Sequence, residues 1–90
     1  MFVRFEVRRW SEEDLAKRLC QLMYGDEKVW LEKQGSTHRW NIGIANDFWL
    51  HPEGGNVFSV HYRYGTTEKQ QALAVMLEWR LGVKLLPERP

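Results

Sequence analysis

The segment that decides the fold runs from Lys28 to Tyr64 and reads KVWLEKQGSTHRWNIGIANDFWLHPEGGNVFSVHYRY. Apolar residues recur at every second position, and three turns interrupt the alternation. Side chains of a β-strand point alternately to the two faces of a sheet. The pattern therefore predicts a four-stranded antiparallel meander with one buried face. The residues predicted to face the core are Val29, Leu31, Trp40, Ile42, Ile44, Phe48, Leu50, Phe58, Val60, Tyr62 and Tyr64.

The three turns predict a register that keeps this buried face continuous. The predicted cross-strand pairs are Val29–Ile42, Leu31–Trp40 and Glu32–Arg39 in the first hairpin, Ile42–Leu50 and Gly43–Trp49 in the second, and Leu50–Phe58 and Phe48–Val60 in the third. Glu32 and Arg39 form a favourable charge pair in this register. The indole of Trp49 is expected to shield the bare backbone of Gly43.

The segments before the meander predict a strand and a helix. Residues 1–9 alternate apolar and polar side chains, as a strand with one charged face does. Ser11 is a good N-cap, acidic residues fill the next turn, and Gly25 is a good C-cap, so a helix is expected over residues 12–24. The place of the first strand in the sheet is not fixed by the sequence. As a neighbour of the second strand it would run parallel to it.

A second helix follows the meander. Thr67 and Gln70 form a capping box, Gly82 ends the helix, and residues 83–86 fit a short last strand. The helix carries two neighbouring apolar stripes, which predicts burial on two sides, against the sheet and against either the first helix or a second protomer. The two stripes are Ala72, Val75, Met76 and Trp79, and Leu73, Leu77 and Leu81.

These elements predict one α+β domain over residues 1–90. Its two layers are a mainly antiparallel sheet, in the order β-α-β-β-β-β-α with a short final strand, and two helices on one face. The outer face of the sheet is left partly open, as antiparallel sheets permit.

Charge and cysteine content narrow the functional classes. Thirteen basic against twelve acidic residues give a net charge of +1, which argues against a dedicated nucleic-acid protein. The lone Cys20 forms no internal disulfide and indicates a reducing compartment. No signal-peptide pattern and no apolar run of about 18 residues occurs, so a soluble, cytoplasmic protein without membrane contact is expected.

The outer sheet face combines indole, imidazole, amide and guanidinium groups. This composition is typical of protein interfaces. The candidate partner-binding residues are Trp30, Arg39, Asn41, Trp49, His51, His61 and Arg63. The two tryptophans are interpreted as anchors, His51 and Asn41 as hydrogen-bonding groups, and the arginines as the rim. Alternatively, the indoles only shield the sheet or are covered by a terminal segment such as Leu85 and Leu86.

Catalytic and metal sites are disfavoured by spacing. The predicted register separates His51 from His61 by four residues, or roughly 13 Å, too far for one ion. Ser59, His61 and Asp47 share the outer face, with His61 paired to Asp47, but an open sheet offers them no pocket or oxyanion donors. No metal, cofactor or enzymatic activity is therefore expected.

The favoured hypothesis is a non-enzymatic module that binds another protein through the outer face. Its size, charge balance and lone cysteine are similar to those of small bacterial or phage inhibitors and immunity-type proteins, and a homodimer through the second helix is a further hypothesis. The alternative is a single-stranded nucleic-acid binder that stacks bases on the same aromatic residues. Glu32, Glu53 and Asp47 on that face disfavour it.

Overall fold

The computed structural model describes residues 2–25, 27–34, 37–43 and 48–87. Its elements in chain order are β1 (Phe2–Glu6), α1 (Glu12–Tyr24), β2 (Val29–Gln34), β3 (Thr37–Ile42), β4 (Phe48–Gly54), β5 (Val57–Tyr62), α2 (Thr67–Met76), the π-helical turn η1 (Leu77–Leu81) and β6 (Lys84–Leu86). The predicted α+β class and the order of strands and helices are confirmed, including the short last strand.

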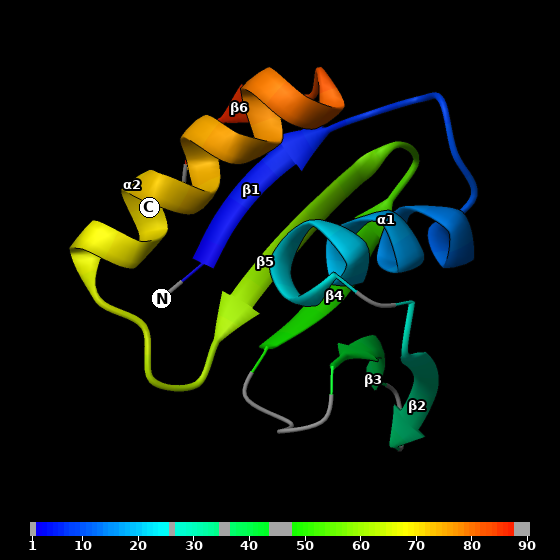
Figure 1. The fold of residues 1–90 in the computed structure, drawn as a ribbon. Helices are drawn as coiled ribbons and strands as arrows, with labels where there is room; N and C mark the ends of the chain where they lie inside the picture. Colours follow the sequence, from blue (N-terminus) through cyan, green and yellow to red (C-terminus); the bar gives the residue numbers. More distant parts are fainter. Residues whose placement is uncertain (1, 26, 35–36, 44–47, 88–90) are drawn as a thin grey trace.

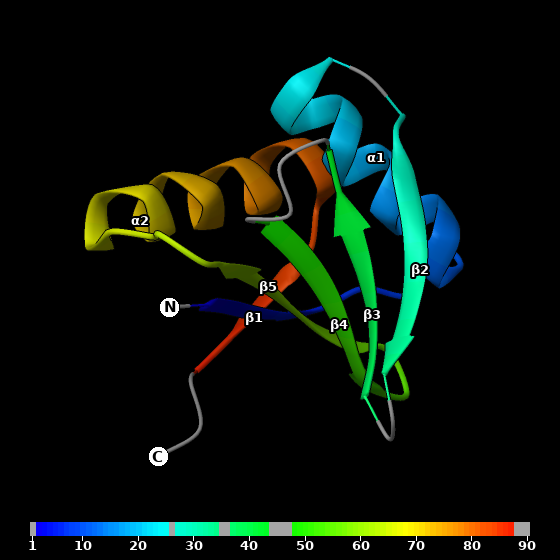
Figure 2. The ribbon, with the colours of Figure 1, turned by 90° about the horizontal axis from the view of Figure 1, so that it is seen from below.

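The described strands form one antiparallel sheet in the order β2-β3-β4-β5-β1-β6. β1 pairs with β5 on one side and with β6 on the other, so it lies far from β2. Both helices lie on the same face of this sheet (Figures 1 and 2). No helix in the described part of the chain is long and apolar enough to span a bilayer.

The core lies between the helices and the inward face of the sheet. It combines alternate residues of the strands with one stripe of each helix. The fully buried large side chains include Phe5, Phe48, Leu50, Val60, Ile42, Leu15, Leu19, Leu73 and Leu77. Two residues predicted to be buried are exposed, because Leu31 lies on the edge strand β2 and Tyr64 follows the end of β5. Ile44, also predicted to be inward, lies outside the described residues.

The ends of α1 are confirmed as the sequence predicts. The Ser11 hydroxyl accepts a hydrogen bond from the backbone N–H of Asp14 at 3.2 Å. Gly25 adopts the left-handed conformation with φ 71°, and its N–H donates to the carbonyl of Gln21. The acidic first turn lies where the helix dipole favours negative charge.

The start of α2 differs from the prediction by one residue. Thr66, not Thr67, is the N-cap, and its hydroxyl accepts from the N–H of Lys69 at 3.2 Å. The side-chain Nε2 of Gln70 donates to the carbonyl of Phe2 at 2.7 Å and ties α2 to β1. Gly82, with φ 64°, ends η1 as predicted.

The register of the first hairpin is as predicted, with Leu31 opposite Trp40 and Trp30 opposite Asn41. The predicted second and third registers are wrong by two residues. The observed pairs there are Trp40–Leu50, Asn41–Trp49, Leu50–Val60, Phe48–Tyr62, Trp49–His61 and His51–Ser59. A slip of two residues leaves every side chain on its predicted face, so the hydrophobic pattern does not detect it. The pairing of β4 with β5 is irregular between Pro52 and Gly54, just before the last turn.

Gly43 is covered by a different ring from the one predicted. Asn41, not Gly43, lies opposite Trp49. A Cβ built on Gly43 would lie 2.7 Å from Cε2 of Tyr24, at the end of α1. Gly43 therefore gives the tyrosine ring room to pack against the sheet, and its φ of 81° also favours glycine.

Candidate functional site on the outer sheet face

A row of side chains crosses five strands on the face opposite the helices. Consecutive members are direct cross-strand partners from β2 through β3, β4 and β5 to β1. This aromatic row consists of Trp30, Asn41, Trp49, His61 and Phe2. The sequence predicted four of the five members, and the structure brings them into one line.

The central rings of the row are stacked. The centroids of Trp49 and His61 are 5.5 Å apart with an interplanar angle of 2°, and Phe2 stacks on His61 at 5.1 Å. The guanidinium of Arg39 lies 4.8 Å from the Trp49 ring centroid. Because β3 and β5 flank β4 on opposite sides, the indole of Trp49 is held between Arg39 and His61.

Trp30 ends the row on the edge strand β2 and is 39% exposed. Beside it, Arg39 and Glu32 lie on neighbouring strands with Nη2 and Oε2 3.9 Å apart. The C-terminal strand Lys84–Leu86 pairs with β1 at the far edge of the sheet instead of lying across the face. The alternative that Leu85 and Leu86 cover the two indoles is therefore wrong.

Asn41, which is predicted to offer hydrogen bonds to a partner, lies beneath the surface of the row. Its side chain is fully buried, because Trp30 and Trp49 lie directly on either side of it. Its Nδ2 donates to Oε2 of Glu32, whereas its Oδ1 accepts no hydrogen bond from the described residues. The amide is therefore part of the support beneath the row.

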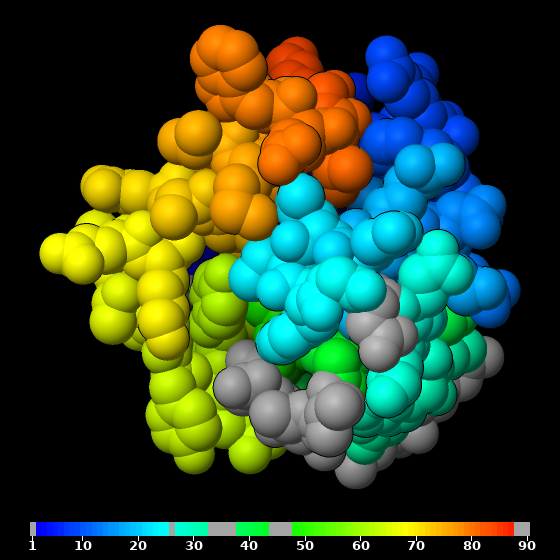
Figure 3. All heavy atoms as spheres, in the orientation of Figure 1, coloured from blue at the N-terminus to red at the C-terminus, as the bar shows by residue number. Residues whose placement is uncertain are grey.

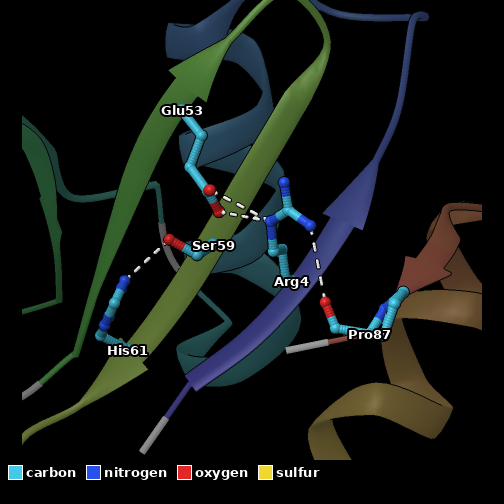
Figure 4. Close-up of polar contacts among 5 residues, drawn as sticks. All are labelled: Arg4, Glu53, Ser59, His61 and Pro87. Carbon is cyan, nitrogen blue, oxygen red and sulfur yellow. Dashed lines mark hydrogen bonds and ion pairs between the residues drawn. The ribbon is translucent and has the colours of Figure 1, made fainter. Parts of the chain in front are cut away.

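A pocket of about 320 Å³ adjoins the row where β4, β5 and β1 meet. Its lining residues are Phe2, Arg4, His51, Pro52, Glu53, Ser59 and His61. Nε of Arg4 donates to both carboxylate oxygens of Glu53, at 3.1 and 3.2 Å, and Nη1 donates to the carbonyl of Pro87 at 3.5 Å (Figure 4). The charges in this pocket are therefore paired within the protein.

The two histidines of the pocket are closer than the predicted register allowed. Their ring centroids are 6.3 Å apart, and their ring planes are nearly perpendicular. The rings lie this close because His51 is opposite Ser59. The predicted separation of roughly 13 Å is wrong. Nδ1 of His51 donates to the carbonyl of His38 at 2.9 Å, since a carbonyl oxygen only accepts. No metal-ligand group of three occurs among the described His, Cys, Asp and Glu residues.

His61 is held in its neutral form. Burial lowers its pKa from 6.5 to about 4, and the neighbouring His51 adds to the effect. Nε2 of His61 lies 2.7 Å from Oγ of Ser59 (Figure 4). Ser59 is only 2% exposed, so its hydroxyl supports the imidazole more readily than it meets a substrate. The predicted pairing of His61 with Asp47 is wrong, since His61 pairs with Trp49, and Asp47 lies outside the described residues.

The remaining predicted residue, Arg63, is exposed just beyond the end of β5. Sequence reasoning missed Phe2, Arg4 and the ion pair that Glu53 forms with Arg4 in the outer-face pocket. The alternation of residues 2, 4 and 6 placed them on one strand face, but nothing in the sequence placed that strand beside β5. No protein-family model, curated protein or solved structure matches this chain, so its function must be inferred from these residues.

Proposed function

We propose that this chain is a small non-enzymatic module that binds another protein through the outer face of its sheet. The observation that carries the proposal is an aromatic row that neither helix covers and that ends in the 39%-exposed Trp30. Tryptophan and arginine dominate the binding energy of protein interfaces, and they meet here at Trp30, Trp49 and Arg39.

The fixed geometry of this face supports rigid docking. Trp49 is held between Arg39 and His61, so little side-chain freedom remains to be lost when a partner binds. The adjoining pocket is large enough for one partner side chain. Because Arg4 and Glu53 neutralise one another and His61 is uncharged at neutral pH, a neutral or aromatic partner side chain fits it best.

Rigid docking also supports the narrower proposal of an inhibitor or immunity-type protein. Such proteins act by covering a surface of their target with a pre-formed surface of their own.

Cys20, the only cysteine, is buried with Sγ 3.2 Å from the Lys28 carbonyl, and it forms no internal disulfide. This agrees with the reducing cytoplasm as the proposed compartment.

The nucleic-acid alternative is less well supported. A base needs an open π-face, and both sides of the Trp49 ring are occupied. Phosphates need unpaired cations, whereas Arg39 and Arg4 each lie against a glutamate. Nucleic acid binding is therefore the competing outcome of the test below.

The test is affinity capture of the partner with the wild-type chain, followed by titration of the purified partner. Trp30→Ala should weaken binding by about 30-fold or more, as truncation of an interface anchor does. Tyr64→Ala is the matched control, because Tyr64 is 74% exposed but lies beyond the sheet face. It should leave the affinity unchanged.

Two results would contradict the proposal. One is that Trp30→Ala and Tyr64→Ala have equal effects on partner binding. The other is that a random-sequence single-stranded oligonucleotide binds the chain with an affinity that falls steeply between low and moderate salt. That affinity would depend on Arg63 and Lys28 rather than on Trp30.

A further inference from the structure

The outward side of α2 and η1 carries a second apolar surface, on the opposite face of the sheet from the aromatic row. Trp79 is 81% exposed and Val75 is 57% exposed, and residues four apart share a helix face. Ala72 continues this stripe one turn earlier and is also exposed. Figure 3 shows the atoms of α2 and η1, yellow to orange, uncovered on the face that is turned to the viewer. The sequence predicted burial for this stripe, whereas in one chain Ala72, Val75 and Trp79 are exposed and Met76 is half-buried.

Charges of opposite sign flank the stripe. Glu78 and Arg80 precede and follow Trp79 in the sequence, so they lie on opposite sides of it around the helix. Both are exposed, and among the described residues neither forms a side-chain hydrogen bond or an ion pair. Arg80 also lines, with Arg18 of α1, a groove of about 380 Å³ between α1 and η1. One flank of the stripe is therefore acidic and the other is doubly basic.

We propose that this face binds a second copy of the chain, with a two-fold axis that runs along the paired helices. Two-fold symmetry is the commonest arrangement of protein oligomers, and it brings Trp79 of one copy against Trp79 of the other. With the axis along the helices, the acidic flank of each copy meets the basic flank of the other. Glu78 of each copy then lies beside Arg80 and Arg18 of the second copy, and the contact occurs twice.

The charges select this arrangement over the antiparallel one. An axis perpendicular to the helices would place each flank against the same flank of the second copy. Arg80 would then meet the basic flank of the second copy, and Glu78 would meet its acidic flank. Charge complementarity of this kind sets the geometry of association more than its strength, which comes from burial of the indoles.

The dimer leaves the proposed docking face free. α2 lies on the inward side of the sheet and the aromatic row lies on the other side, so the two copies present their rows outward. A dimer would therefore bind two partner molecules, or two sites on one partner.

The test is the mass and association constant of the full chain by light scattering and sedimentation equilibrium over a wide concentration range. The mass should rise with concentration from 10.8 kDa to twice that value. Trp79→Ala should lower the association constant by at least about 30-fold. Trp30→Ala, an indole truncation on the other face, is the matched control and should leave it unchanged. Circular dichroism and thermal unfolding establish that each variant is folded.

Charge reversal tests the geometry of the pair. Glu78→Arg or Arg80→Glu alone should weaken association by about tenfold, because like charges then face each other. The double variant Glu78→Arg/Arg80→Glu restores the opposite charges at positions 78 and 80, while Arg18 keeps its charge, so it should recover part of the loss of either single reversal. A chain that stays monomeric at every concentration, or a dimer that survives Trp79→Ala, would overturn the proposal. Single reversals without effect would overturn the parallel arrangement.

Discussion

The imidazole of His61 lies flat against the indole of Trp49, with ring planes 2° apart, while Phe2 covers its other side. This position explains why the proton is disfavoured on His61. The charged form of His61 would lose hydration between two apolar rings, and it would also face a second imidazole, that of His51. The pKa of His61 is therefore lowered to about 4.

Folding stability should consequently fall with acidification. The pKa of His61 in the folded protein is below its ordinary value of 6.5, so the unfolded chain takes up the proton first as the pH falls. The contribution of neutral His61 to folding stability is therefore fully present above pH 6.5 and is lost as the pH falls toward 4. We expect a decrease of about 1–2 kcal/mol in the free energy of unfolding, less than the full shift implies because the ring is partly solvated. Denaturant unfolding at a series of pH values measures it.

His61→Gln is the control for this decrease, since it removes the titrating group and keeps a polar partner for Ser59. Its unfolding free energy should depend less on pH between 6.5 and 5, where most carboxylates are still charged. An NMR titration of the His61 ring with a midpoint near 6.5 would show that the ring is not desolvated as described.

Truncation of inward residues should cost far more than truncation of the exposed indole. Ile42→Ala and Phe58→Ala should each lower the free energy of unfolding by about 2–5 kcal/mol, because both side chains are buried. Trp30→Ala should cost clearly less than either, and the half-buried Trp49 should fall between. Urea unfolding ranks the four variants. If Trp30→Ala were the most destabilising of them, the assignment of the two faces would be wrong.

Gly43 and Gly25 provide a matched pair of glycines. Both have positive φ, 81° and 71°, so alanine is strained at either site by about 1 kcal/mol. A Cβ at Gly25 meets nothing within 4 Å, whereas one at Gly43 must displace the Tyr24 ring. Gly43→Ala should therefore be the more destabilising in thermal unfolding. With Tyr24→Ala in the background, the two substitutions should cost nearly the same, and a persisting difference would contradict this packing.

The sequence determined local features and sheet faces well, because their causes are local. Ser11 begins α1 because its side chain accepts a hydrogen bond from the first turn, and Gly25 ends α1 because it adopts the left-handed conformation. Alternation places Trp30 and Trp49 on the outer face whatever the register. By contrast, a two-residue slip conserves every face, so the pattern could not separate the predicted partner of His51 from the observed one.

The pocket escaped prediction because its walls come from distant parts of the chain. Arg4 and Glu53 are 49 residues apart and meet only because β1 inserts beside β5. A short amphipathic strand pairs equally well with several neighbours, so its sequence does not specify that position. The burial of Asn41 was missed for a related reason, since crowding by two indoles depends on the cross-strand register.

The buried amide of Asn41 depends on Glu32 as its acceptor. Glu32→Ala leaves Nδ2 without a partner, and an unsatisfied buried donor costs about 1–3 kcal/mol. Loss of the Arg39 contact at 3.9 Å adds little, because partly exposed ion pairs are weak. Glu32→Gln keeps an acceptor oxygen and should cost clearly less. The double variant Glu32→Ala/Asn41→Leu replaces both polar partners with apolar groups and should recover much of the loss. Chemical unfolding of the wild type, Glu32→Ala, Asn41→Leu and the double variant closes a double-mutant cycle, and additive effects would show that Glu32 does not support Asn41.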